Sequence, residues 1–287
     1  MRFLHDQVPH HELTYSDVFL VPGRSSVASR LDVELATVDG SGTTIPVAVA
    51  NMTAVAGRRM AETVARCGGL VILPQDIPVE VVTDVVDWVK QRHTVYDTPI
   101  VMDPSGTVGE ALNLLPKRGH GAVIVVNEGR AAGVVTEADC VDVDRFAQVG
   151  SVMSADLLTL PDGISPEDAF NVLHDGGHRL APVVDRAGHV VGILTRERAL
   201  RATLYQPALD DHGRLRVGAA VGISNDAVGK AKSLLDAGVD LLVVDTAHGH
   251  QERMIEVLKA VRSLDPPVPV VAGNVATAAG VTDLVAA

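Results

Sequence analysis

Asp-Leu-Leu-Val-Val-Asp-Thr-Ala-His-Gly-His, at residues 240–250, is the stretch of sequence that decides the fold. Residues 241–244 within it form a short, continuous apolar run, which is typical of a strand buried on both faces. A helical pattern follows over residues 254–261, and a second apolar run at 268–272 leads into Gly273 and Asn274. This order of strand, polar loop, helix and strand predicts a βαβ unit of an α/β protein.

Asp245 stands where the first of these strands gives way to a loop. In parallel α/β folds the loops at the carboxyl ends of the strands carry the chemistry, which makes Asp245 a candidate binding residue. A carboxylate in this position can equally cap the helix that follows. The spacing alone leaves both interpretations open.

The composition indicates a globular protein whose core is built from Val, Ala, Leu and Ile. Of the 287 residues, 47% are hydrophobic, 21% are charged and only 3% are aromatic. The formal net charge of −12 argues against a nucleic acid partner, which would require a basic face. No apolar run approaches the ~18 residues of a membrane span, and the N-terminus has no secretory signal pattern. Two cysteines, Cys67 and Cys140, suit a reducing, cytoplasmic environment.

Further strands and helices flank the opening stretch in the same alternating order. Apolar runs predict strands over residues 45–50, 70–73 and 217–222, and helical spacing predicts helices over 58–67, 79–90 and 226–237. The first of these strands ends at Asn51 and Met52. The methionine can be a core residue or can pack on a planar ligand, because its side chain is flexible and polarizable.

The residues between Lys90 and the strand at 217–222 contain an internal repeat. Residues 121–126 match residues 180–185, and residues 133–139 match residues 192–198, both at an offset of 59. Each unit has the pattern of a strand, a helix, a strand, a turn, a strand and a helix. The repeat predicts an inserted module with two similar halves.

Two motifs resemble the IMP dehydrogenase/GMP reductase family. Residues 245–250 are similar to the family's cofactor loop, and residues 272–277, Ala-Gly-Asn-Val-Ala-Thr, are similar to its next strand end. Residues 13–22 resemble the segment by which the family's chain runs into its barrel. The resemblance implies a (β/α)8 TIM barrel, incomplete within these residues, that oxidises or reduces purine mononucleotides with a nicotinamide cofactor.

The same resemblance implies which residues bind the substrate and the cofactor. Asn51 and Met52 are expected to contact the purine nucleotide. The residues expected to bind the cofactor lie at two strand ends and are Asp245, Thr246, Gly273 and Asn274. No metal site is expected, since the adjacent His10 and His11 point apart in either regular structure.

The inserted repeats resemble a tandem pair of cystathionine-β-synthase-type (CBS) repeats, which dehydrogenases of this family carry in this place. The resemblance divides the chain into a first part of the barrel at 1–92, repeats at about 93–148 and 149–207, and a continuation of the barrel at 208–287. Such modules bind adenine or guanine nucleotides, so ATP and GTP are the expected regulators. A silent module that only spaces subunits is the alternative.

Four residues are expected to bind the regulatory nucleotides. In CBS repeats a threonine meets phosphate, and an acid three residues later holds the ribose hydroxyls. Thr136 and Asp139 fill both roles in the first repeat. In the second repeat Thr195 is followed by Arg198, which can pair with phosphate but cannot accept hydroxyl protons.

Two departures from the family pattern bear on the reaction. Thr53 stands where the family usually has Asp. Pro74-Gln75 replaces the family's His-Lys, and Gln75, unlike lysine, cannot act as a cation or an acid. Asn51-Met52 is more similar to the reductase branch. The sequence therefore predicts a divergent GMP reductase that converts GMP to IMP with NADPH. One alternative is IMP dehydrogenase, which forms XMP with NAD, and another is a non-catalytic purine-nucleotide sensor.

The family's nucleophile is a cysteine on a Gly-rich loop, and the resemblance places it beyond Ala287. Cys67 lies in a helical pattern and Cys140 in the repeats, so both are interpreted as packing residues. No catalytic residue is expected within residues 1–287, and this stretch alone is expected to be inactive. The implied partners are GMP or IMP, NADP with NAD as the alternative, a monovalent cation bound beyond residue 287, and further copies of the chain in a tetramer or octamer.

Overall fold

The computed structural model describes residues 3, 8–11, 13–224 and 226–287, and the chain forms two compact units, 1–35 and 36–287. The first unit contains two 3-10 helices, η2 (Tyr15–Asp17) and η3 (Arg30–Asp32). None of its described residues is buried, and Tyr15, Phe19 and Leu20 are 98%, 85% and 96% exposed. The role predicted for residues 13–22, leading the chain into a barrel, stays a prediction.

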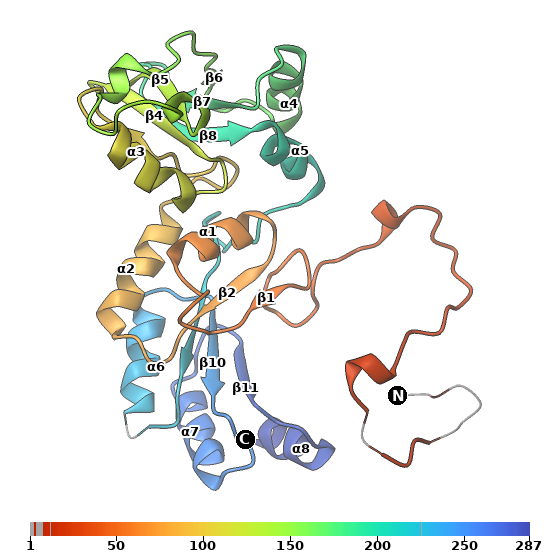
Figure 1. Cartoon of the computed structure of the whole chain (residues 1–287). Coiled ribbons are helices and arrows are strands. Elements are labelled where there is room, and N and C mark those ends of the chain that lie inside the picture. The colour runs from red at the N-terminus through yellow and green to blue at the C-terminus, as the bar shows by residue number, and fades with distance from the viewer. Residues whose placement is uncertain (1–2, 4–7, 12, 225) are drawn as a thin grey trace. The chain divides into compact units, whose positions relative to one another are not determined.

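A five-stranded parallel sheet forms the base of the second unit (Figure 1). In spatial order its strands are β1 (Ala48–Val49), β2 (Leu70–Leu73), β9 (Gly218–Val221), β10 (Leu241–Asp245) and β11 (Val270–Gly273). Because every pairing is parallel, the carboxyl ends of the strands lie along one edge. The strands predicted from residues 70–73, 217–222, 241–244 and 268–272 are confirmed.

The strand predicted at residues 45–50 is shorter than expected. Only Ala48 and Val49 pair with β2. Pro46 has no N–H group to donate to a ladder, and this limits the strand at its start. The strand end at Asn51 is nevertheless where the sequence places it.

A helix follows each strand, with the inserted module lying between α2 and β9 in the sequence. The helices are α1 (Arg58–Arg66), α2 (Val79–Lys90), α6 (Ala227–Asp236), α7 (Glu252–Arg262) and α8 (Ala278–Ala286). In α2 the fully buried Val82, Val86 and Val89 recur every three or four residues, so one apolar stripe faces the sheet. The helices predicted over residues 58–67, 79–90 and 226–237 are confirmed to within one residue at each end, and the helical pattern at 254–261 lies within α7. No helix in the described part of the chain is long and apolar enough to cross a membrane.

The inserted module consists of two units with the same topology, which confirms the repeat. The first contains β3 (Val101–Met102), α3 (Val108–Leu114), η4 (Leu115–Lys117), β4 (Ala122–Asn127) and β5 (Arg130–Thr136). The second contains β6 (Leu160–Pro161), α4 (Pro166–Asp175), β7 (Leu180–Val184), β8 (Val190–Thr195) and α5 (Arg196–Leu204). In each sheet the first pair of strands is parallel and the second is antiparallel, with an irregularity at the equivalent position.

The two units differ in their last element, where one prediction is wrong. A helix is expected after the last strand of each unit, but the first unit has only a 3-10 turn there, η5 (Ala138–Cys140), and a second, η6 (Val149–Ser151), further on. Residues 139–144 include Asp139, Asp142 and Asp144 and two β-branched valines, which are poor helix formers. Asp142 adopts a positive φ of 58°, which ends the turn.

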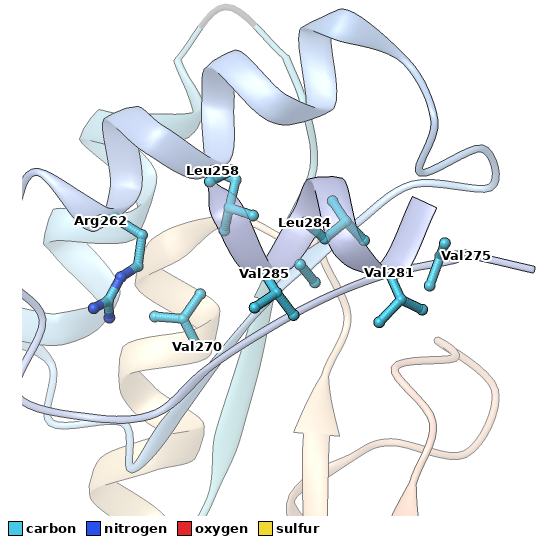
Figure 2. Close-up of a pocket in the computed structure, with 9 residues that line it drawn as sticks. Leu258, Arg262, Val270, Val275, Val281, Leu284 and Val285 are labelled. Carbon is cyan, nitrogen blue, oxygen red and sulfur yellow. The ribbon is translucent and has the colours of Figure 1, made fainter. Parts of the chain in front are cut away.

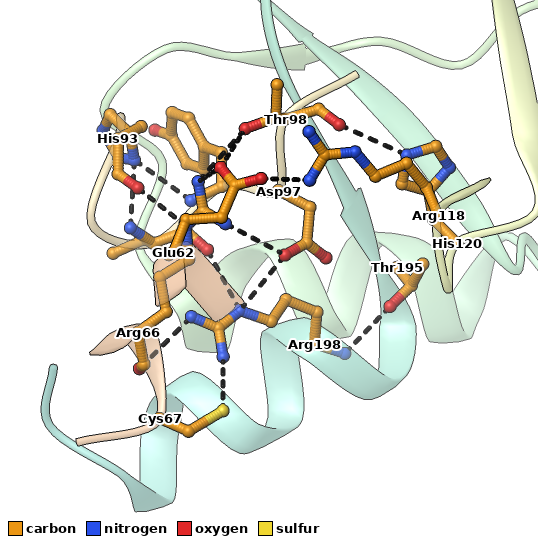
Figure 3. Close-up of polar contacts among 12 residues, drawn as sticks. Glu62, Arg66, Cys67, His93, Asp97, Thr98, Arg118, His120, Thr195 and Arg198 are labelled. Carbon is orange, nitrogen blue, oxygen red and sulfur yellow. Dashed lines mark hydrogen bonds and ion pairs between the residues drawn. The ribbon is translucent and has the colours of Figure 1, made fainter. Parts of the chain in front are cut away.

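A cluster of buried charges joins α1 to the inserted module (Figure 3). Glu62 on α1 is 0% exposed and accepts hydrogen bonds from Arg66 Nη2 at 3.2 Å, from Thr98 Oγ1 and from Arg118 Nη1. Arg66 in turn donates through Nε to the backbone oxygen of His93 at 2.8 Å. Burial would raise the pKa of Glu62, but the charge of Arg66 and the bonds from Thr98 and Arg118 outweigh it and lower the pKa below 4.5. Glu62 is therefore ionised and fully paired.

A second buried cluster lies at the amino ends of the strands. Lys90, the last residue of α2, contacts Asp240 Oδ2 at 2.7 Å and Asp210 Oδ2 at 2.9 Å. Asp240 Oδ2 also accepts the backbone N–H of Val217 at 2.7 Å. This cluster ties the segment before the inserted module to the segment after it and to the loop that leads into β10.

Glu62→Gln tests whether the charges at the junction stabilise the fold. The amide cannot neutralise Arg66 and Arg118, so we expect the free energy of unfolding to fall by about 3–5 kcal/mol, the usual cost of breaking a buried pair on one side. Glu256→Gln is the matched control, since Glu256 pairs with Arg253 on an exposed part of α7. Urea denaturation of both variants measures the difference. Equal stability of Glu62→Gln and the wild-type protein would contradict this account.

Candidate functional site

Polar side chains at three strand ends, together with a glycine after a fourth strand, line one cavity of about 820 Å³ at the carboxyl edge of the sheet. Asn51 follows β1, Gln75 follows β2, Gly222 follows β9, and Asp245 ends β10. Met52, Thr53, Asp76 and Lys230 also line it. The structure thus brings together residues that lie up to 194 positions apart in the sequence.

Asp245 is held by two side-chain amides. Its Oδ2 atom accepts a hydrogen bond from Asn51 Nδ2 at 2.9 Å and another from Gln75 Nε2 at 3.0 Å. Helix α7 begins at Glu252, with Gln251 as its N-terminal cap, so Asp245 does not cap that helix. The helix-capping interpretation of Asp245 is wrong, because five residues of loop separate the aspartate from the cap.

Met52 projects its side chain to the surface of this cavity. It is 61% exposed, which is incompatible with the core interpretation of this methionine. Next to it, Thr53 Oγ1 lies 3.4 Å from Asp76 Oδ2. An exposed, polarizable side chain beside a set of polar groups suits contact with a planar ring.

The other predicted cofactor residues lie beside this cavity and contact one another through backbone groups. The N–H of Thr246 donates to Gly273 O at 2.8 Å, and the N–H of Asn274 donates to Thr246 O at 2.6 Å. The N–H of Gly249 donates to Asn274 O at 2.7 Å, and a Cβ atom at Gly249 would overlap this oxygen. Residues 245–250 and 273–276 therefore pack together as one loop pair at the ends of β10 and β11.

A second cavity, of about 370 Å³, has the wrong chemistry for a polar substrate (Figure 2). It lies where α7 and α8 meet β11, and its lining is aliphatic except for Arg262. Figure 2 shows Leu258, Val270, Val281 and Leu284 around it. It offers no set of convergent polar groups, so the cavity at the strand ends is the stronger candidate.

The predicted nucleotide residues of the first repeat lie together. Both the N–H and the hydroxyl of Thr136 donate to Asp139 Oδ2, at 2.7 and 2.8 Å. Thr136 lines a cavity of about 590 Å³ together with Gly121 of the same repeat. Arg179, from the neighbouring repeat, also lines this cavity. The threonine and a cation thus line one cavity, and the acid contacts the threonine.

The predicted residues of the second repeat are arranged differently. Thr195 caps α5, accepting the N–H of Arg198 at 3.0 Å. The Arg198 guanidinium turns towards α1, as Figure 3 shows, where it donates to Arg66 O at 3.3 Å and lies 3.4 Å from Cys67 Sγ. Both residues line a cavity of about 400 Å³ with several other arginines: Arg118, Arg179, Arg196 and Arg201.

Neither cysteine lies at the main cavity. Cys67 caps the end of α1, and Cys140 is buried in the first repeat. Among the described residues no group of three or more His, Cys, Asp or Glu side chains could hold a metal ion.

Comparison with known proteins identifies the chain. The model of the IMP dehydrogenase / GMP reductase domain family matches residues 12–287. The chain belongs to this family. The five-stranded sheet accordingly corresponds to part of the family's TIM-type barrel.

The relatives in this family include enzymes of both branches. The chain is 53% identical to the GMP reductase of Mycobacterium tuberculosis (strain ATCC 25618 / H37Rv) over 287 residues, covering 100% of the chain and 60% of that protein. It is 34% identical to the inosine-5'-monophosphate dehydrogenase of Nitrosopumilus maritimus over 280 residues, covering 96% of the chain and 59% of that protein. The chain therefore spans about three-fifths of the length of these curated relatives.

Solved structures show the same likeness. The GMP reductase of Trypanosoma brucei in complex with guanosine 5'-triphosphate matches with a TM-score of 0.61 and 32% identity, covering 96% of the chain and 68% of that protein. A variant of that enzyme in complex with guanosine 5'-monophosphate matches with a TM-score of 0.61 and 31% identity, over 96% and 60% of the two chains.

Sequence reasoning missed Gly222 and Lys230 as lining residues of the main cavity, and it identified Gln75 only as a replacement for the family's usual lysine. Lys230 on α6 donates to the backbone oxygens of Gln75 and Ile77, the latter at 3.0 Å. Gln75 and Gly222 each follow a strand, as Asn51 and Asp245 do, and this shared position was the signal available in the sequence. Lys230 lies inside a helix, and no pattern in the sequence marks it.

Gly249→Ala tests the packing of the loop pair. The added methyl group would meet the backbone oxygen of Asn274, so we expect a loss of about 1–3 kcal/mol in the free energy of unfolding. Gly119→Ala is the matched control, because a Cβ atom there meets nothing within 4 Å. Thermal and urea unfolding measure both variants, and an unchanged Gly249→Ala protein would show that the loops are not in contact.

Proposed function

We propose that the protein is a GMP reductase, which converts GMP, NADPH and two protons to IMP, NADP⁺ and an ammonium ion. The observation that carries the proposal is the 53% identity to a GMP reductase over the whole chain, compared with 34% to a dehydrogenase. The grouping of Asn51, Met52 and Asp245 around one cavity supports it. We also propose that the five-stranded sheet is part of a complete (β/α)8 TIM barrel with eight strands.

Asp245 suits the role of acceptor for cofactor hydroxyl groups. Two hydrogen bonds reach its Oδ2 atom from neutral amides, and no cation in the described part of the chain forms an ion pair with it. When bound, the nicotinamide cofactor supplies the hydride. Asp245 and the loop pair that contains Thr246, Gly273 and Asn274 would hold the ribose of the cofactor.

Asn51 and Met52 suit the nucleotide. The thioether of Met52 offers an apolar surface for the purine ring, while Asn51 is oriented by its bond to Asp245. This bond links the substrate position to the cofactor position through one shared carboxylate.

We place the protein in the cytoplasm as a homo-oligomer, a tetramer or octamer.

Steady-state kinetics of the complete gene product test the reaction. With GMP and NADPH, we expect NADPH to be consumed and IMP to form, with no XMP from IMP and NAD. Asp245→Ala should lower kcat/KM for the cofactor roughly 5- to 150-fold, the equivalent of about 1–3 kcal/mol for a lost acceptor. Asp87→Ala, on the exposed side of α2, is the control. Robust XMP production would replace the proposal with IMP dehydrogenase, and no turnover of either nucleotide would favour a sensor.

We further propose that the inserted module, residues 93–207, is a pair of CBS repeats through which ATP and GTP regulate the enzyme. The matching strand topology of the two halves supports this, as do Thr136 and Arg179, which line one cavity, and the hydrogen bond from Thr136 to Asp139. Regulation requires the nucleotide to bind two states of the protein unequally. The second site, near Thr195 and Arg198, offers several arginines for phosphate, and Arg198 stands where the first repeat has the acid Asp139.

Titration calorimetry of the complete protein with ATP and with GTP tests the regulatory sites. We expect Asp139→Ala to remove the binding event at the first repeat, because the ribose loses its acceptor and Thr136 its partner. Asp156→Ala, which replaces an exposed aspartate near the start of the second repeat, should bind as the wild-type protein does. If neither nucleotide binds at about millimolar concentration, the module is a spacer; if Arg198→Ala but not Asp139→Ala abolishes binding, the second repeat holds the nucleotide.

A further inference from the structure

Three independent features fix the position of Gln75 in the lining of the main cavity. Its backbone oxygen accepts a hydrogen bond from Lys230, which also binds Ile77 O at 3.0 Å. Its side-chain nitrogen donates to Asp245 Oδ2 at 3.0 Å. Its side-chain oxygen lies against Gly222, in space that a Cβ atom at position 222 would fill. The backbone contact with Lys230, the hydrogen bond to Asp245 and the space beside Gly222 together define the position of the Gln75 side chain.

We propose that Gln75 is a positioning residue for Asp245, which fixes the carboxylate as a charged acceptor for the nicotinamide cofactor. The inference rests on the proposed function. The physical reason is the neutrality of the amide. A cation at this position would form an ion pair with Asp245 and reduce its capacity to accept hydroxyl protons, whereas an amide orients the carboxylate and leaves its charge in place.

Asn51 alone cannot provide the same control. A single hydrogen bond allows the carboxylate of Asp245 to rotate about the contact, while two donors from different strands, β1 and β2, define its direction. Gly222, which follows a third strand, β9, leaves the space that the side chain of Gln75 occupies. The orientation of Asp245 therefore depends on groups at three neighbouring strand ends.

Gln75→Met removes the donor while keeping the length of the side chain. We expect the KM for the cofactor to rise roughly 5- to 30-fold, the factor that corresponds to losing 1–2 kcal/mol, while the KM for GMP changes by less than about twofold. Gln91→Met, at the exposed end of α2, controls for the substitution itself. An unchanged cofactor KM in Gln75→Met would overturn the proposal.

Gly222→Ala tests the same contact without altering Gln75. The new methyl group displaces only the end of a flexible side chain, so the protein should fold and the cofactor KM should rise as in Gln75→Met. In the double variant Gly222→Ala/Gln75→Met the two effects should not add, because both act through one interaction. Additive effects would mean that Gly222 acts independently of Gln75.

Gln75→Glu gives a signature that a purely structural role would not produce. Two carboxyl groups at this separation cannot both ionise, so the pKa of the new glutamate should be raised. Below that pKa the protonated acid donates to Asp245 as the amide does, and above it repulsion should raise the cofactor KM. The wild-type protein should lack this pH step.

Carbon-13 NMR titration of Gln75→Glu measures the glutamate pKa without an activity assay. A raised pKa in a protein that does not reduce GMP would reject the proposed function and retain the Gln75–Asp245 contact. Normal wild-type turnover with an unshifted glutamate and a pH profile parallel to wild type would reject the positioning role alone.

Discussion

The buried ion pairs of Lys90 with Asp210 and Asp240 are the contacts on which the organisation of this chain depends. Lys90 ends α2 just before the inserted module, and Asp210, 2.9 Å away, lies just after it. Asp240, 2.7 Å away, leads into β10. Burial alone would raise the pKa of Asp210, but hydrogen bonds from Lys90 and from the backbone of Arg214 and His212 outweigh it and hold the pKa well below 3.8. The two ends of a long insertion are thereby held together, and the sheet continues from β2 to β9 as if no residues intervened.

The aspartates at the two edges of the sheet have different hydrogen-bonding partners. At the amino edge Asp210 and Asp240 share a cation, as expected where charges serve stability. At the carboxyl edge the donors to Asp245 among the described residues are the amides of Asn51 and Gln75, which orient the carboxylate without adding a positive charge. This difference fits the general rule for parallel α/β barrels, in which the amino face serves stability and the carboxyl face carries the chemistry.

Much of the fold and part of the site could be predicted from the sequence. Continuous apolar runs such as β2 and β10 gave correct strands because burial on both faces leaves a strong local pattern. The loop at Asp245 was predictable because a parallel sheet places every carboxyl end at one edge. The turn at Ala138–Cys140 was not, since its difference from α5 lies in weak helix propensities rather than in apolar spacing. The direction of Arg198 depends on α1, more than 130 residues away in the sequence, and no local pattern records it.

The buried charges around Glu62 and Arg66 constrain how such a protein can evolve. These two residues lie on a helix of the barrel, but their partners Thr98 and Arg118 lie in the inserted module. A lineage that lost the module would leave a carboxylate and a guanidinium without those partners on α1. Loss or exchange of the module would therefore have to be accompanied by substitutions at positions 62 and 66, so these two barrel positions should change together with the presence of the module across the family.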